Sequence, residues 1–71
     1  MSRGNLQERL ADLVDDMAAG GIRMDEAVRE LEGQFLRRVL DESKGNQSRA
    51  AAALGIHRNT LRNKMRRCGL L

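Results

Sequence analysis

The chain has 71 residues, which is enough for one small domain but leaves it a core of limited stability, typically about 3–5 kcal/mol. The single cysteine, Cys68, excludes an internal disulfide, and one histidine and one cysteine without ligand spacing exclude a metal site. With no proline, one aromatic residue (Phe35) and no apolar run near the roughly 18 residues of a membrane span, the composition favours an all-α domain supported by oligomerisation.

Charge is divided unevenly along the chain. Residues 1–42 contain six basic and all ten acidic residues, a net charge of −4, whereas residues 43–71 contain seven basic residues and no Asp or Glu, a net charge of +7. A segment of 29 residues without a carboxylate is typical of a surface that binds a polyphosphate. The alternative is a solvated basic tail, but the same segment also has the pattern of folded structure.

The first predicted helix begins at Asn5, a residue type that favours the N-cap, with Glu8 at the capping-box position three residues on. Its apolar residues fall within an arc of about 100° on a helical wheel, which indicates one buried face. They are Leu6, Leu10, Leu13, Val14 and Met17. Gly20 and Gly21 are expected to end the helix, because glycine readily adopts the left-handed conformation found at helix ends.

The second predicted helix runs from about Met24 to Ser43 and carries two apolar stripes about 100° apart. Such a helix must be contacted from two sides, and a second copy of the chain is an economical source of one contact. The sequence leaves open which stripe faces that copy. Gly33 lies mid-helix, at a cost of about 1 kcal/mol, which either a close backbone approach or simple tolerance explains. The main stripe contains Met24, Ala27, Val28, Leu31, Phe35 and Val39, and the second contains Leu36 and Leu40.

Two shorter helices are predicted in the basic segment. Asn46 suits the N-cap of a helix over residues 47–54, and Gly55 suits the tight turn that follows it. The last helix begins at residue 57 or 58 and ends at residue 67. Its buried edge is predicted to consist of Leu61, Met65 and Cys68, at helical spacing.

A helix, a one-glycine turn and a basic helix are the layout of a DNA-binding helix-turn-helix. Ala51 is small enough to let the two helices cross closely, and Leu54, Ile56 and Leu61 fill the wedge between them. At the start of the second helix, Arg58 is of the type that binds guanine through two hydrogen bonds. The small-residue pattern is weak by itself, but together with the charge of residues 43–71 it favours duplex DNA as the ligand.

The same segment carries a longer pattern, Gly45-Asn46-Gln47-Ser48-Arg49-Ala50-Ala51, then Leu54-Gly55-Ile56, then Arg58-Asn59-Thr60-Leu61-Arg62, with Lys64 and Gly69. This pattern resembles the Fis-type helix-turn-helix family, which includes the nucleoid protein Fis and the C-terminal domains of NtrC-like activators. The resemblance implies one Fis-like domain over residues 1–71, with dimerisation helices in residues 5–43 and the helix-turn-helix in residues 46–68. It implies a homodimer whose N-terminal helices intertwine into a four-helix core, and binding that is coupled to bending of the duplex.

The resemblance also implies roles for particular residues. Base contacts are expected from the positions that face the major groove, His57, Arg58, Thr60 and Asn63. Phosphate contacts are expected from Asn46, Ser48, Arg49, Arg62, Lys64, Arg66 and Arg67. The dimer core is expected to contain Leu10, Leu13, Met17, Leu31, Phe35 and Val39.

Some features depart from the family. His57 and Asn63 stand where the nucleoid protein has Asn and Lys, which alters the expected base preference at one position and removes a positive charge at the other. Because the chain begins about four residues before its first predicted helix, we expect neither the recombinase activation nor the ATP-driven promoter opening of larger relatives.

Two classes of function remain open from the sequence. The first is a homodimer in the bacterial cytoplasm and nucleoid that binds double-stranded DNA sequence-selectively and bends it, in transcription regulation or nucleoid organisation. The second is a helical dimerisation or adaptor module whose basic half binds an acidic protein, with RNA a weaker variant because the aromatic residues that stack single-stranded bases are missing. Neither class requires a catalytic residue, a cofactor, a metal, a membrane or a small-molecule substrate, and the sequence contains no catalytic constellation.

Overall fold

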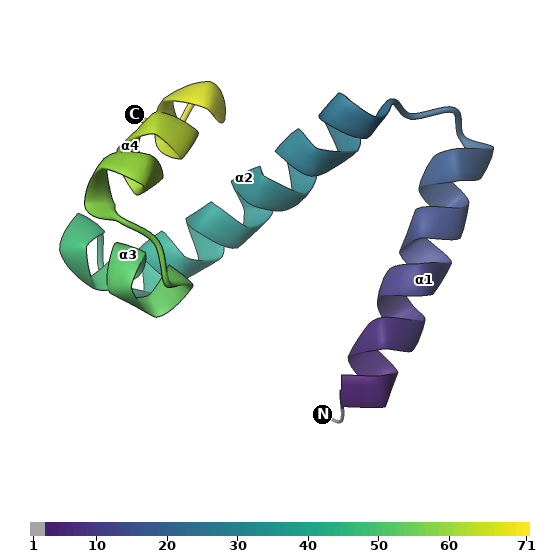
Figure 1. Ribbon diagram of the computed structural model, residues 1–71, viewed down its shortest axis with the longest axis horizontal. Coiled ribbons are helices and arrows are strands. Elements are labelled where there is room, and N and C mark those ends of the chain that lie inside the picture. Colours follow the sequence, from purple (N-terminus) through teal and green to yellow (C-terminus); the bar gives the residue numbers. More distant parts are fainter. Residues whose placement is uncertain (1–2) are drawn as a thin grey trace.

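The computed structural model describes residues 3–71, with side chains from residue 5 onward, as four α-helices joined by short turns (Figure 1). They are α1 (Arg3–Ala19), α2 (Met24–Glu42), α3 (Gln47–Leu54) and α4 (Arg58–Arg67). No strand occurs within this described part, so the predicted all-α class with four helices is confirmed. Residues 1 and 2 of the predicted domain lie outside the described residues, and the intertwined dimer stays a prediction.

The first residues of α1 and α2 show how far local capping preferences determine where a helix begins. α1 begins at Arg3, so the prediction that Asn5 caps it was wrong, and Asn5 lies inside the helix. An asparagine within a helix costs less than about 1 kcal/mol, so its preference for the cap is too weak to decide where a helix begins. α2 begins as predicted, with Asp25 and Glu26 in its first turn, and Glu26 Oε1 accepts a hydrogen bond of 3.2 Å from the backbone N–H of Arg23.

The buried core lies where α3 and α4 pack against the C-terminal half of α2. Its buried side chains are Leu36, Ala50, Ala51, Leu61 and Met65. Partly buried apolar residues surround them, namely Val39, Leu40, Leu54, Ile56, Cys68 and Leu70. The stripe that contains Leu36 and Leu40 is therefore the one that the chain covers with its own helix-turn-helix.

Val39 behaves differently from the other residues predicted for the dimer core. It is half-buried and packs beside Leu36 against the chain's own core. The positions one and two turns earlier, Phe35 and Leu31, are 56% and 54% exposed. The main stripe of α2 thus divides into a C-terminal residue that supports the helix-turn-helix and an N-terminal part that is uncovered.

Gly33 lies at the point where the end of α4 approaches α2. The residue is buried, and a Cβ atom added to it would lie 3.9 Å from both the Cβ and the Sγ of Cys68. The neighbouring atoms belong to side chains and not to a backbone, so the close backbone approach that the sequence offered as one explanation is not observed. Because 3.9 Å is ordinary van der Waals contact, the approach of Cys68 does not by itself require glycine.

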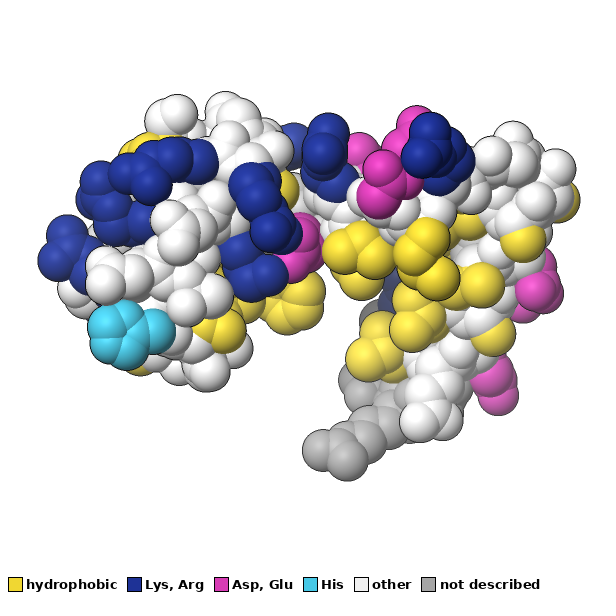
Figure 2. Space-filling model, turned by 45° about the horizontal axis from the view of Figure 1, so that its top comes forward, with side chains coloured by type: hydrophobic (Ala, Val, Ile, Leu, Met, Phe, Trp, Pro, Cys, Tyr) yellow, Lys and Arg dark blue, Asp and Glu magenta, His cyan; other side chains and the backbone are white. Residues whose placement is uncertain are grey.

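α1 stands apart from the other helices (Figure 1), and it packs against none of them to the extent that α2, α3 and α4 pack together. The radius of gyration of 13.7 Å accordingly exceeds the value of about 11 Å expected for a compact chain of this length. Figure 2 shows hydrophobic side chains gathered on the facing sides of α1 and α2. The exposed apolar residues of these two helices include Leu6, Leu10, Leu13, Val14, Val28, Leu31 and Phe35.

Within the described residues, no helix combines the length and the hydropathy that crossing a bilayer requires. The exposed apolar surface of α1 and α2 contains a depression of about 130 Å³. It lies between Leu13 and Val14 of α1 and Val28 and Leu31 of α2.

Leu61 is the largest fully buried side chain of the core. We expect Leu61→Ala to lower the free energy of unfolding by about 2–5 kcal/mol, because the lost apolar contacts leave a cavity between α2, α3 and α4. Urea denaturation at a fixed chain concentration measures the change. Leu71→Ala, at an exposed terminal position, is the matched control and should change stability by less than about 0.5 kcal/mol. Equal losses in the two variants would show that the core is not where the structure places it.

Candidate nucleic-acid interface

The turn between α3 and α4 has the geometry that its sequence predicted. Asn46 caps α3, its Oδ1 accepting a hydrogen bond of 3.1 Å from the backbone N–H of Arg49. Gly55 adopts a left-handed conformation with φ of 70°, and the next residue, Ile56, donates its backbone N–H to the carbonyl oxygen of Ala51 at 3.0 Å. Residues with a Cβ adopt this φ at a steric cost, so glycine at position 55 lets the chain reverse directly into α4.

The residues predicted to read bases are exposed at the start of α4. His57 is the N-cap residue, and its Nδ1 lies 3.4 Å from the backbone nitrogen of Asn59, from which it accepts a hydrogen bond. Arg58, Thr60 and Asn63 are exposed, whereas Leu61 and Met65 of the same helix are buried. The helix therefore presents its predicted base-reading residues to solvent and uses other positions for the core.

Residues predicted to contact phosphate fall into two groups. Asn46, Ser48, Arg49, Arg66 and Arg67 are exposed, whereas Arg62 and Lys64 are half-buried. Figure 2 shows Lys and Arg side chains spread over the part of the molecule that contains α3 and α4. Among the exposed residues, Arg66 donates through Nη1 to Asn63 Oδ1 at 3.3 Å, a contact within α4.

Both half-buried cations bond to side chains of neighbouring helices. Arg62 donates through Nη1 to Gln47 Oε1 at 3.1 Å, which joins α4 to the first turn of α3. Lys64 donates to Glu32 Oε2, which joins α4 to α2. α4 is therefore held on two flanks, and these two predicted phosphate contacts already have partners within the chain.

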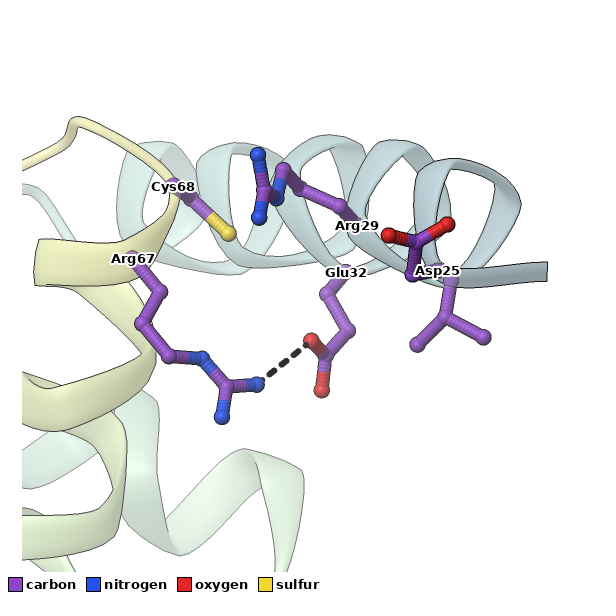
Figure 3. A pocket seen from close by; sticks show the side chains of 6 residues that line it. Asp25, Arg29, Glu32, Arg67 and Cys68 are labelled. Atoms are coloured by element: carbon purple, nitrogen blue, oxygen red, sulfur yellow. Dashed lines mark hydrogen bonds and ion pairs between the residues drawn. The ribbon is translucent and has the colours of Figure 1, made fainter. Parts of the chain in front are cut away.

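Glu32 is a residue of the site that sequence reasoning did not identify. Its carboxylate binds Lys64 through one oxygen and Arg67 through the other, with 3.2 Å between Arg67 Nη2 and Glu32 Oε1. Figure 3 shows the Arg67 and Glu32 side chains reaching toward each other from α4 and α2. The bonded residues lie 32 and 35 positions apart in the sequence, so no local pattern could have indicated the contact.

The hydrogen bond from Lys64 is the main reason why the pKa of Glu32 lies below its usual value of 4.5. Partial burial of the carboxyl group opposes this change, and the positive charges of Lys64 and Arg67 add to it. The net effect keeps Glu32 ionised at neutral pH and in mild acid. The carboxylate of Glu32 therefore supplies a negative charge beside α4.

The opening beside this ion pair offers no recognisable chemistry of its own. It has a volume of about 360 Å³ and is lined by two carboxylates, two guanidinium groups and Cys68 among others (Figure 3). Within the described residues, no group of His, Cys, Asp or Glu side chains is placed to hold a metal ion. The arrangement that stands out is the exposed start of α4 on a basic helix-turn-helix.

Comparison with known proteins places these features in one family. Residues 27–67 match the family described as "Bacterial regulatory protein, Fis family". A Fis-like DNA-binding protein of Xylella fastidiosa is 57% identical over 44 residues, which cover 62% of this chain and 49% of the relative. A Fis-like DNA-binding protein of Neisseria meningitidis serogroup B is 38% identical over 69 residues, covering 97% of this chain and 85% of the relative.

The matches also include part of a larger protein. The DNA-binding transcriptional regulator NtrC of Azospirillum brasilense is 39% identical over 62 residues, 87% of this chain but 13% of that regulator. The match with the Xylella fastidiosa protein spans about half of that relative's length. No solved structure matches the chain.

The Glu32 ion pairs predict a pH-dependent contribution to stability. Because the pKa of Glu32 is lowered by folding, its contribution is present above the ordinary value of 4.5 and is lost as the pH falls through the lower folded-state pKa. We expect Glu32→Gln to lower the free energy of unfolding at pH 7 by about 1 kcal/mol. The difference in free energy from the unmodified chain should narrow as the pH falls below 4.5. Urea denaturation between pH 7 and pH 3 measures both effects.

Glu42→Gln is the matched control for this experiment. Glu42 pairs with Arg38 at 3.8 Å, but both side chains are largely exposed, so its replacement should have little effect at any pH. A difference between Glu32→Gln and the unmodified chain that stays constant from pH 7 to pH 3 would contradict the assigned ion pairs.

Proposed function

Because the chain belongs to the Fis family of bacterial regulatory proteins, we propose that it binds double-stranded DNA as a homodimer, selects among sequences and bends the duplex. The observation that carries the proposal is the exposed start of α4, with Arg58, Thr60 and Asn63 on a helix-turn-helix whose own segment contains no carboxylate. Two relatives named as DNA-binding proteins support it. The output of this binding would be transcription regulation or nucleoid organisation, which places the protein in the bacterial nucleoid.

Sequence selection is assigned to the first turns of α4. The major groove is wide enough to admit one α-helix, and an arginine there can bind guanine through two hydrogen bonds. Arg58 is the first residue of α4 and is exposed, so it can reach a base edge without leaving the fold. His57, Thr60 and Asn63 are assigned to neighbouring base edges, which makes the start of α4 the base-reading surface.

Affinity for any sequence is assigned to phosphate contacts. Neutralising phosphates with basic side chains releases counterions from DNA, so each such contact makes binding more salt-dependent. Three exposed residues lie at the start of α3, namely its N-cap residue Asn46, Ser48 and Arg49. Arg66 and Arg67 are exposed at the end of α4. The two groups come from the start of the first helix and the end of the second helix of the helix-turn-helix.

The homodimer is proposed because α1 and α2 leave a continuous apolar surface uncovered. Isolated chains rarely expose apolar patches larger than a few hundred Å² without a partner that covers them. The range that matches the Fis family, residues 27–67, contains Leu31 and Phe35 of the uncovered stripe. In the proposed dimer, residues 5–43 of two chains cover each other and residues 46–68 of each chain form one DNA-binding unit.

The dimer can be tested by placing a charge on the uncovered stripe. Phe35 is 56% exposed in the single chain, so Phe35→Asp should leave the chain folded but prevent association, because a carboxylate would be buried in the interface. Sedimentation equilibrium at micromolar concentration measures the mass. Leu71→Asp, at another exposed apolar residue outside α1 and α2, is the control and should remain dimeric. If Phe35→Asp and Leu71→Asp associate equally well, the stripe is not the interface.

Base reading and phosphate contact predict different losses. Arg58→Ala should weaken binding to a selected site by roughly 1–3 kcal/mol and relax the preference at one base. Arg66→Ala should weaken binding to selected and random duplexes alike and lower the slope of log K against log salt by about 0.9 for each subunit. Fluorescence anisotropy titrations at several salt concentrations measure both quantities.

The same titrations separate DNA binding from the adaptor alternative. Equal losses for Arg58→Ala on selected and random duplexes would refute its base-reading role. If the unmodified chain bound neither duplex at low salt, the basic surface would instead fit an acidic protein partner.

A further inference from the structure

The helix-turn-helix segment contains no acidic residue, but in the folded chain an acidic residue of another helix lies against it. Residues 43–71 contain seven cations and no acid, yet folding brings Glu32 of α2 against α4. Within the described residues, the ion pairs that join α2 to α4 both end on this carboxylate, one from Lys64 and one from Arg67. Two of the seven cations therefore have a carboxylate partner before any DNA is bound.

The two ion pairs differ in how accessible they are. The side chains of Lys64 and Glu32 are 30% and 23% exposed, so water screens this pair only partly. The side chain of Arg67 is 66% exposed and uses one of its donor groups on Glu32. A phosphate could add to Arg67 from the solvent side. At Lys64 a phosphate would have to share the ammonium group with the Glu32 carboxylate, whose negative charge opposes a second anion there.

We propose that Glu32 is a positioning residue that occupies the place of a DNA phosphate for Lys64 and thereby withholds this lysine from the DNA backbone. The carboxylate joins α4 to α2, the helix that carries the uncovered apolar stripe. It also offers Lys64 an anion at hydrogen-bonding distance. The inference rests on the proposed DNA binding, and it replaces the sequence-based expectation that Lys64 contacts phosphate with a role inside the fold.

The role has a measurable electrostatic consequence. A cation that stays paired with a carboxylate neutralises no phosphate, so it displaces no counterion from the DNA. Lys64 should therefore add nothing to the salt dependence of binding. Glu32→Gln removes the negative charge and keeps the shape of the side chain, which frees Lys64 to bind phosphate. The salt slope on a random duplex should then become steeper by about 0.9 for each subunit.

A double-mutant cycle of Glu32→Gln and Lys64→Met, read out by this salt slope, tests the proposal. In the unmodified background we expect Lys64→Met to change the slope by less than about 0.3 for each subunit. In the Glu32→Gln background the same replacement should lower it by about 0.9. Arg66→Met is the control cation, because Arg66 is exposed and its hydrogen bond goes to the neutral Asn63, and it should lower the slope by about 0.9 in both backgrounds.

The outcomes separate this inference from the proposed function. If Lys64→Met lowers the slope by about 0.9 in the unmodified background, Lys64 already contacts phosphate and the inference is overturned while DNA binding stands. This arm needs no change at Glu32, so it decides the question even if Glu32→Gln fails to fold. An unchanged slope in a folded Glu32→Gln chain would likewise overturn it. Failure of the unmodified chain to bind a random duplex at low salt would instead refute the proposed function.

Discussion

The rest of the structure depends on one constraint, namely that α1 and α2 carry apolar surface that a single copy of the chain leaves exposed. One side of α2 is satisfied, because Leu36 and its neighbours are buried by α3 and α4. The other side, with Leu31 and Phe35, stays exposed together with the apolar face of α1. In the proposed dimer the helix that supports each helix-turn-helix is also the helix that joins the two chains, so association would fix both DNA-binding units relative to each other.

The distribution of charge follows the same division of labour. Acidic residues lie on the helices that are proposed to associate, and the helix-turn-helix segment has none. Glu32 is the point at which these two parts meet, and its bonds to Lys64 and Arg67 hold α4 on the side that faces α2. Together with the bond from Arg62 to Gln47, they hold α4 in place, which in the proposed complex would reduce the ordering that DNA binding requires.

The parts of the fold that depend on neighbouring residues could be predicted from the sequence. The Asn46 cap, the Gly55 turn and the buried edge of α4 each follow from a few adjacent positions. The cap and the turn are confirmed, and so is the burial of Leu61 and Met65, whereas Cys68 is only partly buried, at the C-cap of α4. Local preference failed at Asn5, where it was too weak to set the start of α1. It could not show that Val39 packs against the chain's own core or that Glu32 reaches Lys64, because packing between helices decides these contacts. The roles of individual residues toward DNA stay predictions.

The most direct test of the central claim is the number of chains per particle, measured by sedimentation equilibrium of the unmodified protein, alone and with a short DNA duplex. The account predicts two chains per particle at micromolar concentration, and two chains on each duplex at low salt. A chain that remains single in both conditions would contradict it, because its apolar helices would then be stable in water without a partner.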